Sequence, residues 1–349
     1  MAVQNLEELY YKLSDAIEKL DLEAIWKDFK PLKFALYNDK ECFFDGHYIE
    51  KTAIFCANTA IAFEGEYIAI WNVSEEMDFQ VFVSKIVHEM FHAFQETQDW
   101  GCFTREMEAL YKYQYSAENL SIKLHENELL LELLDEFDED KYKELMDCRK
   151  YRSERFPYEF TYETQVEEIE GTANYVEWKV LEQLDKDKSK KLIEDMQGCM
   201  TKPEYFFPIR ISSYYTGVLM IKAMSDAGKF TYAKRVSPRV CELLDEMDNV
   251  EELPFTDQQG FEAVEKALLS FQSESKEIVE KSVDNNEVVL TGPLDMVSVN
   301  IYDARFYQGY ITSRFFLMYR ENGENKAIHD NYVIKMKDEK TIETVYKWA

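Results

Sequence analysis

Two histidines and a glutamate stand at a spacing that suits metal-assisted hydrolysis. The segment His88-Glu89-Met90-Phe91-His92 has the pattern H-E-x-x-H within a stretch that reads as a helix. The i, i+4 spacing places both imidazoles on one helical face, where two nitrogens can reach one metal ion. Glu89 projects beside this pair and could take a proton from a metal-bound water.

A catalytic zinc ion usually has three protein ligands and leaves a fourth position for water. One common arrangement places a third histidine shortly after the motif, which here would be Gln98, and needs a glycine where the chain has Gln95. That arrangement is therefore excluded. A glutamate from a second helix is the other solution, and the acidic segment 167–177 is the best candidate to supply it.

The two segments together resemble the glutamate-zincin superfamily of zinc peptidases, which contains thermolysin-like enzymes and related aminopeptidases. In many members H-E-x-x-H-A-x-Q is followed by a helix that reads E-G-x-A-x-Y. This chain has HEMFHAFQ at His88–Gln95 and EGTANY at Glu170–Tyr175. The resemblance spans roughly residues 50–230 in arrangement. It implies a zincin-like fold, one Zn²⁺ ion with His88, His92 and Glu170 as ligands, and peptide-bond hydrolysis.

Small residues beside Glu170 support its assignment independently. Gly171 and Ala173 would let this helix approach the motif helix closely enough for a carboxylate to reach the same ion. Asn174 lies at i+4 from Glu170 and therefore on the same face. Thermolysin-like members have the pattern E-x-x-x-D here, and its aspartate orients a ligand histidine. Asn174 stands in place of that aspartate, and its side-chain oxygen could accept a hydrogen bond from an imidazole N–H.

Two other ligand assignments stay open. Glu167 or Glu168 could be the third ligand, although neither is followed by small residues. The string Gly-Thr-x-Asn also faintly resembles the G-T-x-D of aspartate-zincins, which would make Asn174 the ligand. An amide oxygen is a poor ligand for zinc, which disfavours that interpretation.

Amide hydrolysis develops an oxyanion, which a Tyr, His or Arg donor can stabilise. Members of the superfamily often carry Tyr-x-x-Gly one helix beyond the glutamate, and residues 214–217 read Y-Y-T-G. The resemblance implies Tyr214 as the donor, with Tyr215 and Arg210 as further candidates. The chain has 23 tyrosines, so ordinary packing explains Tyr214 about equally well.

The elements around the motif are predicted to be strands on one side and helices on the other. Ile61–Phe63 and Tyr67–Trp71 flank Glu64-Gly65-Glu66, which favours a hairpin in a strand-rich region at 43–73. The strand Tyr67–Trp71 matches the edge strand that binds extended peptides in the superfamily. A peptide or protein substrate would lie along it by strand addition.

The motif helix is expected from about Ser74 or Asp78 to Gln98. Apolar residues cover most of its circumference, which indicates a helix buried inside a domain. Two histidines and a glutamate in such a helix need partners, because unpaired buried polar groups are costly. A metal ion would supply them.

The remaining pattern predicts a mainly helical α+β protein. Helices are expected over residues 3–30, 104–150, 162–184, 187–198, 213–227, 238–247 and 257–281. After Asp284–Asn286 the pattern becomes β-prone, with Asn322-Gly323 as a turn before a strand near Tyr332–Met336. We therefore expect a zincin-like metallopeptidase domain at 1–284 and a small antiparallel β-rich domain at 285–349.

Composition bounds the partners and the compartment. The 68 acidic and 40 basic residues give a net charge of −28, which opposes affinity for nucleic acid or anionic membranes. No apolar run approaches the ~18 residues of a membrane span, and the N-terminus does not read as a signal peptide. We therefore expect a cytoplasmic protein with reduced thiols. The six cysteines form no C-x-x-C pair, so they do not read as a metal cage.

The sequence thus favours a cytoplasmic zinc metallopeptidase in which Glu89 is the general base. The alternative is a non-catalytic binding or regulatory protein of the same fold that retains the zinc site. The oligomeric state and the mode of cleavage, internal or terminal, are not readable from the sequence.

Overall fold

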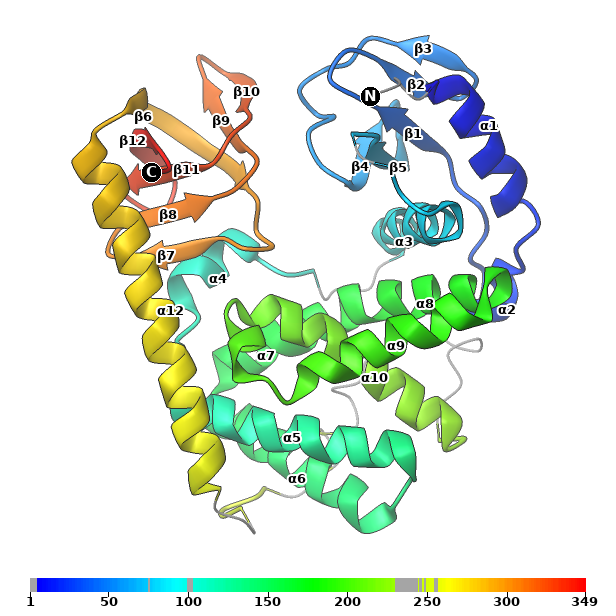
Figure 1. The fold of residues 1–349 in the computed structure, drawn as a ribbon, viewed down its shortest axis with the longest axis vertical. Coiled ribbons are helices and arrows are strands. Elements are labelled where there is room, and N and C mark those ends of the chain that lie inside the picture. The colour runs from blue at the N-terminus through cyan, green and yellow to red at the C-terminus, as the bar shows by residue number, and fades with distance from the viewer. Residues whose placement is uncertain are drawn as a thin grey trace.

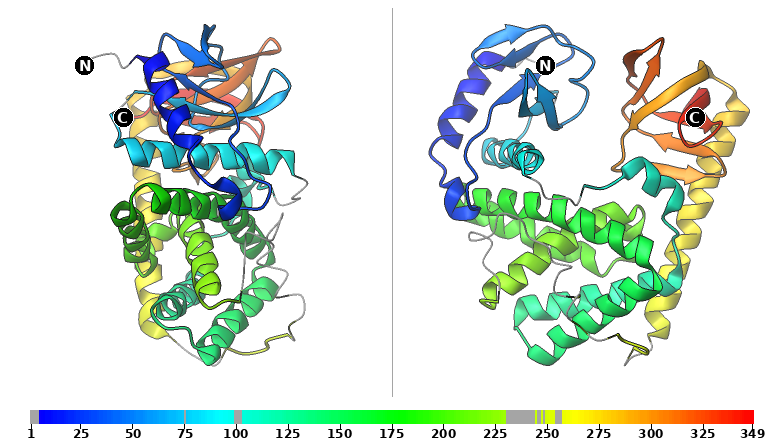
Figure 2. Two further views of the ribbon diagram at one scale, coloured as in Figure 1. Left: turned by 90° about the vertical axis from the view of Figure 1, so that its right-hand side faces the viewer. Right: turned by 180° about the vertical axis from the view of Figure 1, so that it is seen from behind.

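The computed structural model describes residues 5–74, 76–98, 103–229, 244, 247, 249–253 and 257–349. Within these residues the chain is a mixed α+β protein, mainly helical, as the sequence predicted. A five-stranded sheet and a seven-stranded sheet stand apart over a layer of helices (Figures 1 and 2). Among the described residues, no helix has both the length and the apolar character needed to cross a membrane.

The N-terminal region folds as two helices and the five-stranded sheet. The elements are α1 (Leu6–Ile17), α2 (Leu22–Ile25), β1 (Phe34–Tyr37), β2 (Cys42–Phe44), β3 (His47–Ile49), β4 (Thr59–Phe63) and β5 (Glu66–Asn72). The β4–β5 hairpin is confirmed. Its two-residue turn, Glu64-Gly65, has φ of 50° and 86°, the positive values that match the twist of a tight hairpin.

The prediction that Tyr67–Trp71 forms the edge strand is wrong. The strand order is β3-β2-β1-β5-β4, so β5 pairs in parallel with β1 on one side and antiparallel with β4 on the other. Ile68–Trp71 is a continuous buried run, which suits an interior strand covered on both faces. The edge on this side of the sheet is β4, which is only partly buried.

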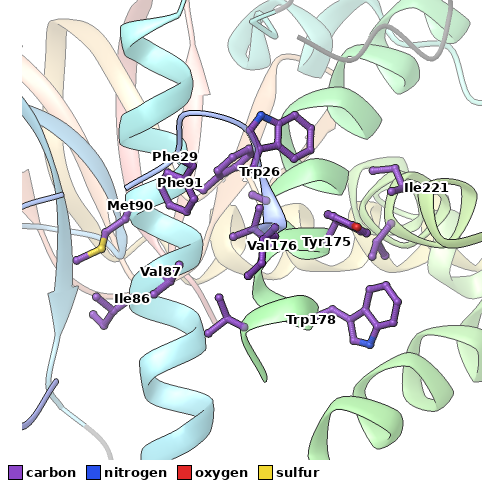
Figure 3. Packing of buried hydrophobic residues seen from close by; sticks show 14 of the residues in the cluster. Trp26, Phe29, Ile86, Val87, Met90, Phe91, Tyr175, Val176, Trp178 and Ile221 are labelled. Carbon is purple, nitrogen blue, oxygen red and sulfur yellow. The ribbon is translucent and has the colours of Figure 1, made fainter. Parts of the chain in front are cut away.

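The motif helix, α3 (Phe79–Thr97), follows β5 and begins at Asp78, whose side chain accepts a hydrogen bond from the Val81 N–H. Its apolar side packs against α8 (Thr172–Leu184) and the segment after α2. Figure 3 shows Phe91 meeting Trp26 and Phe29, with Val176 of α8 in the same cluster. This packing fixes α3 between the five-stranded sheet and the helical layer.

The helical layer contains most of the predicted helices with shifted boundaries. Its elements are α4 (Glu106–Lys112), α5 (Ala117–Asp135), α6 (Glu139–Arg155), α7 (Pro157–Val166), α8, α9 (Lys186–Met200), η2 (Pro203–Phe206) and α10 (Ile209–Asp226). The helix predicted at 162–184 is part of a longer one, because a π-helical turn, η1 (Glu167–Gly171), joins α7 to α8. The helix predicted at 238–247 falls largely outside the described residues.

The C-terminal region begins with the long helix α12 (Gln258–Asn285), which runs along one side of the molecule (Figure 1). The strands are β6 (Val288–Val299), β7 (Arg305–Tyr307), β8 (Tyr310–Ser313), β9 (Leu317–Glu321), β10 (Glu324–Ile328), β11 (Tyr332–Met336) and β12 (Thr341–Lys347). They form one antiparallel sheet in the order β10-β9-β6-β12-β11-β8-β7, with an apolar cluster of its own. The Asn322-Gly323 turn leads into β10, a strand that the sequence did not predict.

A neutral cluster of charges holds α5, α6 and the α7–η1 segment together. Its six members are each at most 2% exposed: Lys123, Arg149, Arg152, Glu126, Glu163 and Glu167. Arg152 binds Glu126 at 2.9 Å and Glu163 at 2.6 Å, and Arg149 binds Glu167 at 2.6 Å. Since buried charges are tolerated only when they are paired, these contacts fix how the three helices meet.

The turn η1 also meets α10 at very close range. A Cβ on Gly171 would lie 2.6 Å from the Gly217 Cα, so the two backbones touch without side chains between them. The expectation that Gly171 permits approach to the motif helix is therefore wrong, because its close neighbour is α10. Ala173 does lie in the core that α3 and α8 share.

Replacing Gly217 with alanine should force α10 away from η1 and destabilise the protein. Its Cβ would lie 2.7 Å from the Glu167 carbonyl oxygen and 2.7 Å from the Gly171 Cα, both backbone atoms that cannot rotate away. We expect Gly217→Ala to lower the free energy of unfolding by about 1–3 kcal/mol or more. The matched control is Gly198→Ala in α9, which has open space around it and should gain about 0.5–1 kcal/mol. Equal urea midpoints for both variants would contradict this packing.

The buried charge cluster predicts acid sensitivity. Burial alone would raise the pKa of Glu163, but Arg152 and Lys123 outweigh it and hold the pKa at about 2, below its ordinary 4.5. A lowered folded-state pKa stabilises the protein above pH 4.5, and the benefit disappears as the pH falls towards 2. The loss is up to about 3 kcal/mol. Urea midpoints measured from pH 7 to 2 should fall less steeply in Glu163→Gln, although that variant is less stable at pH 7.

Candidate metal centre

Three potential ligand atoms from two helices converge in one place. The His88 Nε2 and the His92 Nε2, both on α3, lie 3.1 Å apart. The Glu170 Oε2, on η1, lies 3.3 Å from the His92 Nε2 and 3.8 Å from the His88 Nε2. Among the described residues, these are the ligand atoms that gather within 4.8 Å of one another and could hold a metal ion.

The groups that face the Nδ1 atoms of the two imidazoles make this site suited to a cation. The His88 Nδ1 lies 3.0 Å from a Glu177 carboxylate oxygen, and the His92 Nδ1 lies 2.7 Å from the Gln95 Oε1. Both partners are acceptors, so they favour the tautomer with the proton on Nδ1 and a lone pair on Nε2. Two lone pairs and a carboxylate oxygen then face one another, an arrangement that a bound cation would stabilise.

Glu177 is the residue that orients His88. It lies two turns beyond Glu170 on α8, is buried, and pairs with Lys85 of α3 at 2.8 Å. Burial alone would raise the pKa of Glu177, but Lys85 and His88 outweigh it and hold that pKa at about 2. The prediction that Asn174 accepts from an imidazole is wrong, because the two Nδ1 atoms face Glu177 and Gln95. The Asn174 amide nitrogen donates to the Glu170 carbonyl oxygen at 2.7 Å.

Gln95 orients the second imidazole and ties α3 to η1. Its side-chain nitrogen donates to the Ile169 carbonyl oxygen at 2.8 Å and to the Thr172 hydroxyl at 2.9 Å. These two bonds turn the Gln95 Oε1 towards His92. Gln95, which stands where the three-histidine arrangement would need a glycine, therefore positions His92 in this site.

Arg210 of α10 determines which carboxylate oxygen of Glu170 is left to face a metal ion. Its Nη2 donates to the Glu170 Oε1 at 2.6 Å, which leaves Oε2 for the histidines' side. The same guanidinium also donates to Glu106 and, through Nε at 2.8 Å, to the Tyr214 hydroxyl. Burial would raise the pKa of Glu170, but His92 and Arg210 hold it well below its usual range. Glu170 is thus ionised, with Oε1 bound to Arg210 and Oε2 facing the two histidines.

The protonation of His88 responds to the same carboxylates. Burial alone would lower the pKa of His88, but Glu170, Glu177 and Glu89 outweigh it and raise the pKa to about 10. Without a cation, a proton would therefore take the metal's place between His88 and Glu170. This competition is expected of a ligand set that binds metal in exchange for protons.

Glu89 faces the same space with a carboxylate that has no hydrogen bond or ion pair to any described residue. It is partly buried on α3, and burial raises its pKa. A carboxylate with a raised pKa and no protein partner can accept and return a proton. This is the chemistry that the sequence assigned to Glu89.

These side chains lie in a cleft of about 640 Å³. One wall is the edge strand β4 with residues 54–58 before it, and the floor is α3 and η1. The other wall is the C-terminal sheet, through the end of β6, residues 300–302 and β9. The cleft thus lies between the two sheets of Figure 1.

The structure keeps one of the other candidates beside this group and places three elsewhere. Tyr214 lines the cleft, whereas Tyr215 packs against the helical core. Glu167 pairs with Arg149 in the buried charge cluster, and Glu168 is not among the converging ligand atoms.

Comparison with known proteins finds no similarity: no family model, no curated protein and no solved structure matches this chain.

The sequence did not reveal the residues that orient the ligands, although a spacing signal exists for each. Gln95 lies at i+3 from His92, and Glu177 lies at i+7 from Glu170, so each is on the same helical face as the ligand beside it. Lys85 lies at i−3 from His88. Helical spacing identifies these residues as candidates, but only the packing of α3 on α8 shows which contacts form.

Removing the charge of Glu177 should weaken metal binding without removing a ligand. We expect Glu177→Gln to lower Zn²⁺ affinity about 10- to 100-fold, since a neutral amide holds the His88 ring less firmly and makes it less basic. Competition with a chromophoric chelator measures this affinity. The control is Glu182→Gln on the same helix, where the carboxylate is 42% exposed and pairs with Lys179. Equal affinities in the two variants would exclude an orienting role for Glu177.

Proposed function

We propose that this chain is a zinc-dependent peptidase with a zincin-like catalytic domain. The carrying observation is the convergence of His88, His92 and Glu170 beside Glu89, a carboxylate on the cleft that has no hydrogen bond or ion pair to any described residue. His88, His92 and Glu170 would hold the ion, a donor set of two imidazoles and one carboxylate that is typical of catalytic zinc. The resemblance of the two sequence motifs to the glutamate-zincins supports the same function.

Each residue around the ion would have a separate task. A bound zinc ion would supply Lewis acidity and lower the pKa of a water molecule. Glu89 would take the proton of the attacking water and pass it to the leaving amine. Tyr214, whose hydroxyl accepts a hydrogen bond from Arg210, is the donor that the sequence resemblance implies for the carbonyl oxygen as charge develops there.

The substrate would be a peptide or protein segment bound along β4. This strand is the edge of the sheet and lines the cleft through Thr59, Ala60 and Ile61, so its free backbone groups are available for strand addition. β4 thus takes the place that the sequence analysis gave to Tyr67–Trp71. A non-catalytic protein that only keeps the zinc would not require a free carboxylate beside the ligands, so Glu89 favours catalysis.

Metal analysis together with a peptidase assay tests the proposal. The wild-type protein, purified under reducing conditions, should hold one zinc per chain and cleave members of a quenched fluorescent peptide library. His88→Ala should lose the zinc and the activity. Glu89→Gln should keep the zinc and lose at least about 10²-fold in kcat, since only the proton transfer is removed.

One control variant and two possible outcomes make this test specific. His329→Ala removes an exposed histidine far along the chain from the motif and should change neither zinc content nor activity. Protein that binds zinc but cleaves no peptide would support the non-catalytic alternative. Protein that binds no zinc would end the proposal altogether.

A further inference from the structure

The C-terminal sheet forms one wall of the cleft, although its sequence carries no motif. The lining residues from this sheet and its loops are Ser298, Val299, Asn300, Ile301, Tyr302, Phe316 and Met318. They face β4 across the space that contains His88, Glu89 and Glu170. Any peptide bound on β4 above the ligands would therefore also meet this wall.

The loop after β6 is held in one conformation by side-chain hydrogen bonds. The Asn300 N–H donates to the Ser313 hydroxyl at 3.1 Å, and the Asn300 amide donates to the Asp303 carboxylate at 3.2 Å. The Ser313 hydroxyl donates to the Phe316 carbonyl oxygen at 2.7 Å, and Arg314 pairs with Asp303 at 3.3 Å. A loop that is fixed at both ends in this way can present its central residues at a defined position.

Tyr302 is a polar residue that this loop presents to the cleft. Its ring meets the Tyr214 ring edge-on, with the centroids 6.1 Å apart, and its side chain is 47% exposed. Its hydroxyl has no hydrogen bond to any described residue. Burial raises its pKa despite the neighbouring Lys85, so the hydroxyl remains a proton donor at neutral pH.

The two tyrosines at the centre differ in what their hydroxyls already bind. The Tyr214 hydroxyl is engaged by Arg210, which also holds Glu170, so Tyr214 is part of the group that directs the ligand carboxylate. Tyr302 lies on the opposite wall, and its hydroxyl has no hydrogen bond to any described residue. Its hydroxyl therefore has no competing hydrogen bond from a described residue when a molecule enters the cleft.

We propose that Tyr302 is a substrate-contacting catalytic residue, whose hydroxyl donates a hydrogen bond to the carbonyl oxygen of the peptide bond that is cleaved. This inference rests on the proposed peptidase function. The peptide lies between β4, which binds its backbone, and the C-terminal sheet, which supplies the donor. The C-terminal sheet is then a part of the active site and not an appended module.

Kinetics of the full-length, zinc-loaded protein test this role. Tyr302→Phe removes only the hydroxyl, and we expect kcat on the best peptide of a quenched fluorescent library to fall about 100-fold. Zinc content and thermal midpoint should not change, because the variant keeps the ring that meets Tyr214 and loses only a hydroxyl that has no hydrogen bond to a described residue. The matched control is Tyr310→Phe in β8, a half-buried tyrosine outside the cleft, which should keep wild-type kcat.

A binding measurement separates catalysis from simple attachment. In zinc-loaded Glu89→Gln protein, a fluorescein-labelled copy of that peptide should bind with the same Kd, within about threefold, whether residue 302 is tyrosine or phenylalanine. A hydrogen bond that strengthens only as charge develops on the carbonyl oxygen lowers kcat and leaves ground-state affinity intact. Tyr302→Ala, which also removes the ring, should weaken binding about tenfold.

The outcomes distinguish this inference from the function on which it rests. If the wild-type protein cleaves peptides and Tyr302→Phe does so at the same rate, the role of Tyr302 is wrong and the peptidase function stands. A loss of zinc in Tyr302→Phe would equally contradict a substrate-contacting role. If the wild-type protein neither binds nor cleaves any peptide, the proposed function fails, and the role of Tyr302 fails with it.

Discussion

The convergence of two imidazole nitrogens and a carboxylate oxygen within one partly buried site is the constraint on which the rest of the structure depends. Such groups repel one another unless a cation or a proton lies between them. Each is therefore held by a second group: His88 by Glu177, His92 by Gln95, and Glu170 by Arg210. The packing of α3 on α8 brings Glu177 to His88, and the packing of α10 on η1 brings Arg210 to Glu170.

The π-helical turn divides two carboxylates that stand only three residues apart. Glu167 pairs with Arg149 inside the buried charge cluster, whereas Glu170 faces the histidines. A π turn adds a residue to one helical turn and so changes the directions of the side chains on either side, which is why such turns are frequent at functional sites. The contact of Gly171 with Gly217 then brings α10 close enough for Arg210 to reach Glu170.

The sequence could predict the parts of this centre that depend on local spacing. His88, Glu89 and His92 share one helix, and the β4–β5 hairpin depends on a two-residue turn, so both are encoded within a few residues. β4 is the edge strand because β1 pairs with the other side of β5. That pairing joins residues 35 positions apart, such as Phe34 and Ala69, so no local pattern predicts it. The roles of Glu177 and Tyr302 likewise depend on which helices and sheets pack together, and no local pattern carries that information.

The charges that line the cleft suit a divalent cation. Among the described lining residues, three carboxylates, Glu89, Glu96 and Glu170, face one guanidinium, that of Arg210. A divalent cation at the histidines would balance this excess, and it would do so in a space shielded by two sheets, where electrostatic interactions are stronger than in open water. An extended peptide adds little charge of its own, so the balanced cleft can receive it. β4 and Tyr302 are far apart in the sequence but lie on two walls of the same cleft. The centre is thus shielded on two sides and still accessible to an extended peptide.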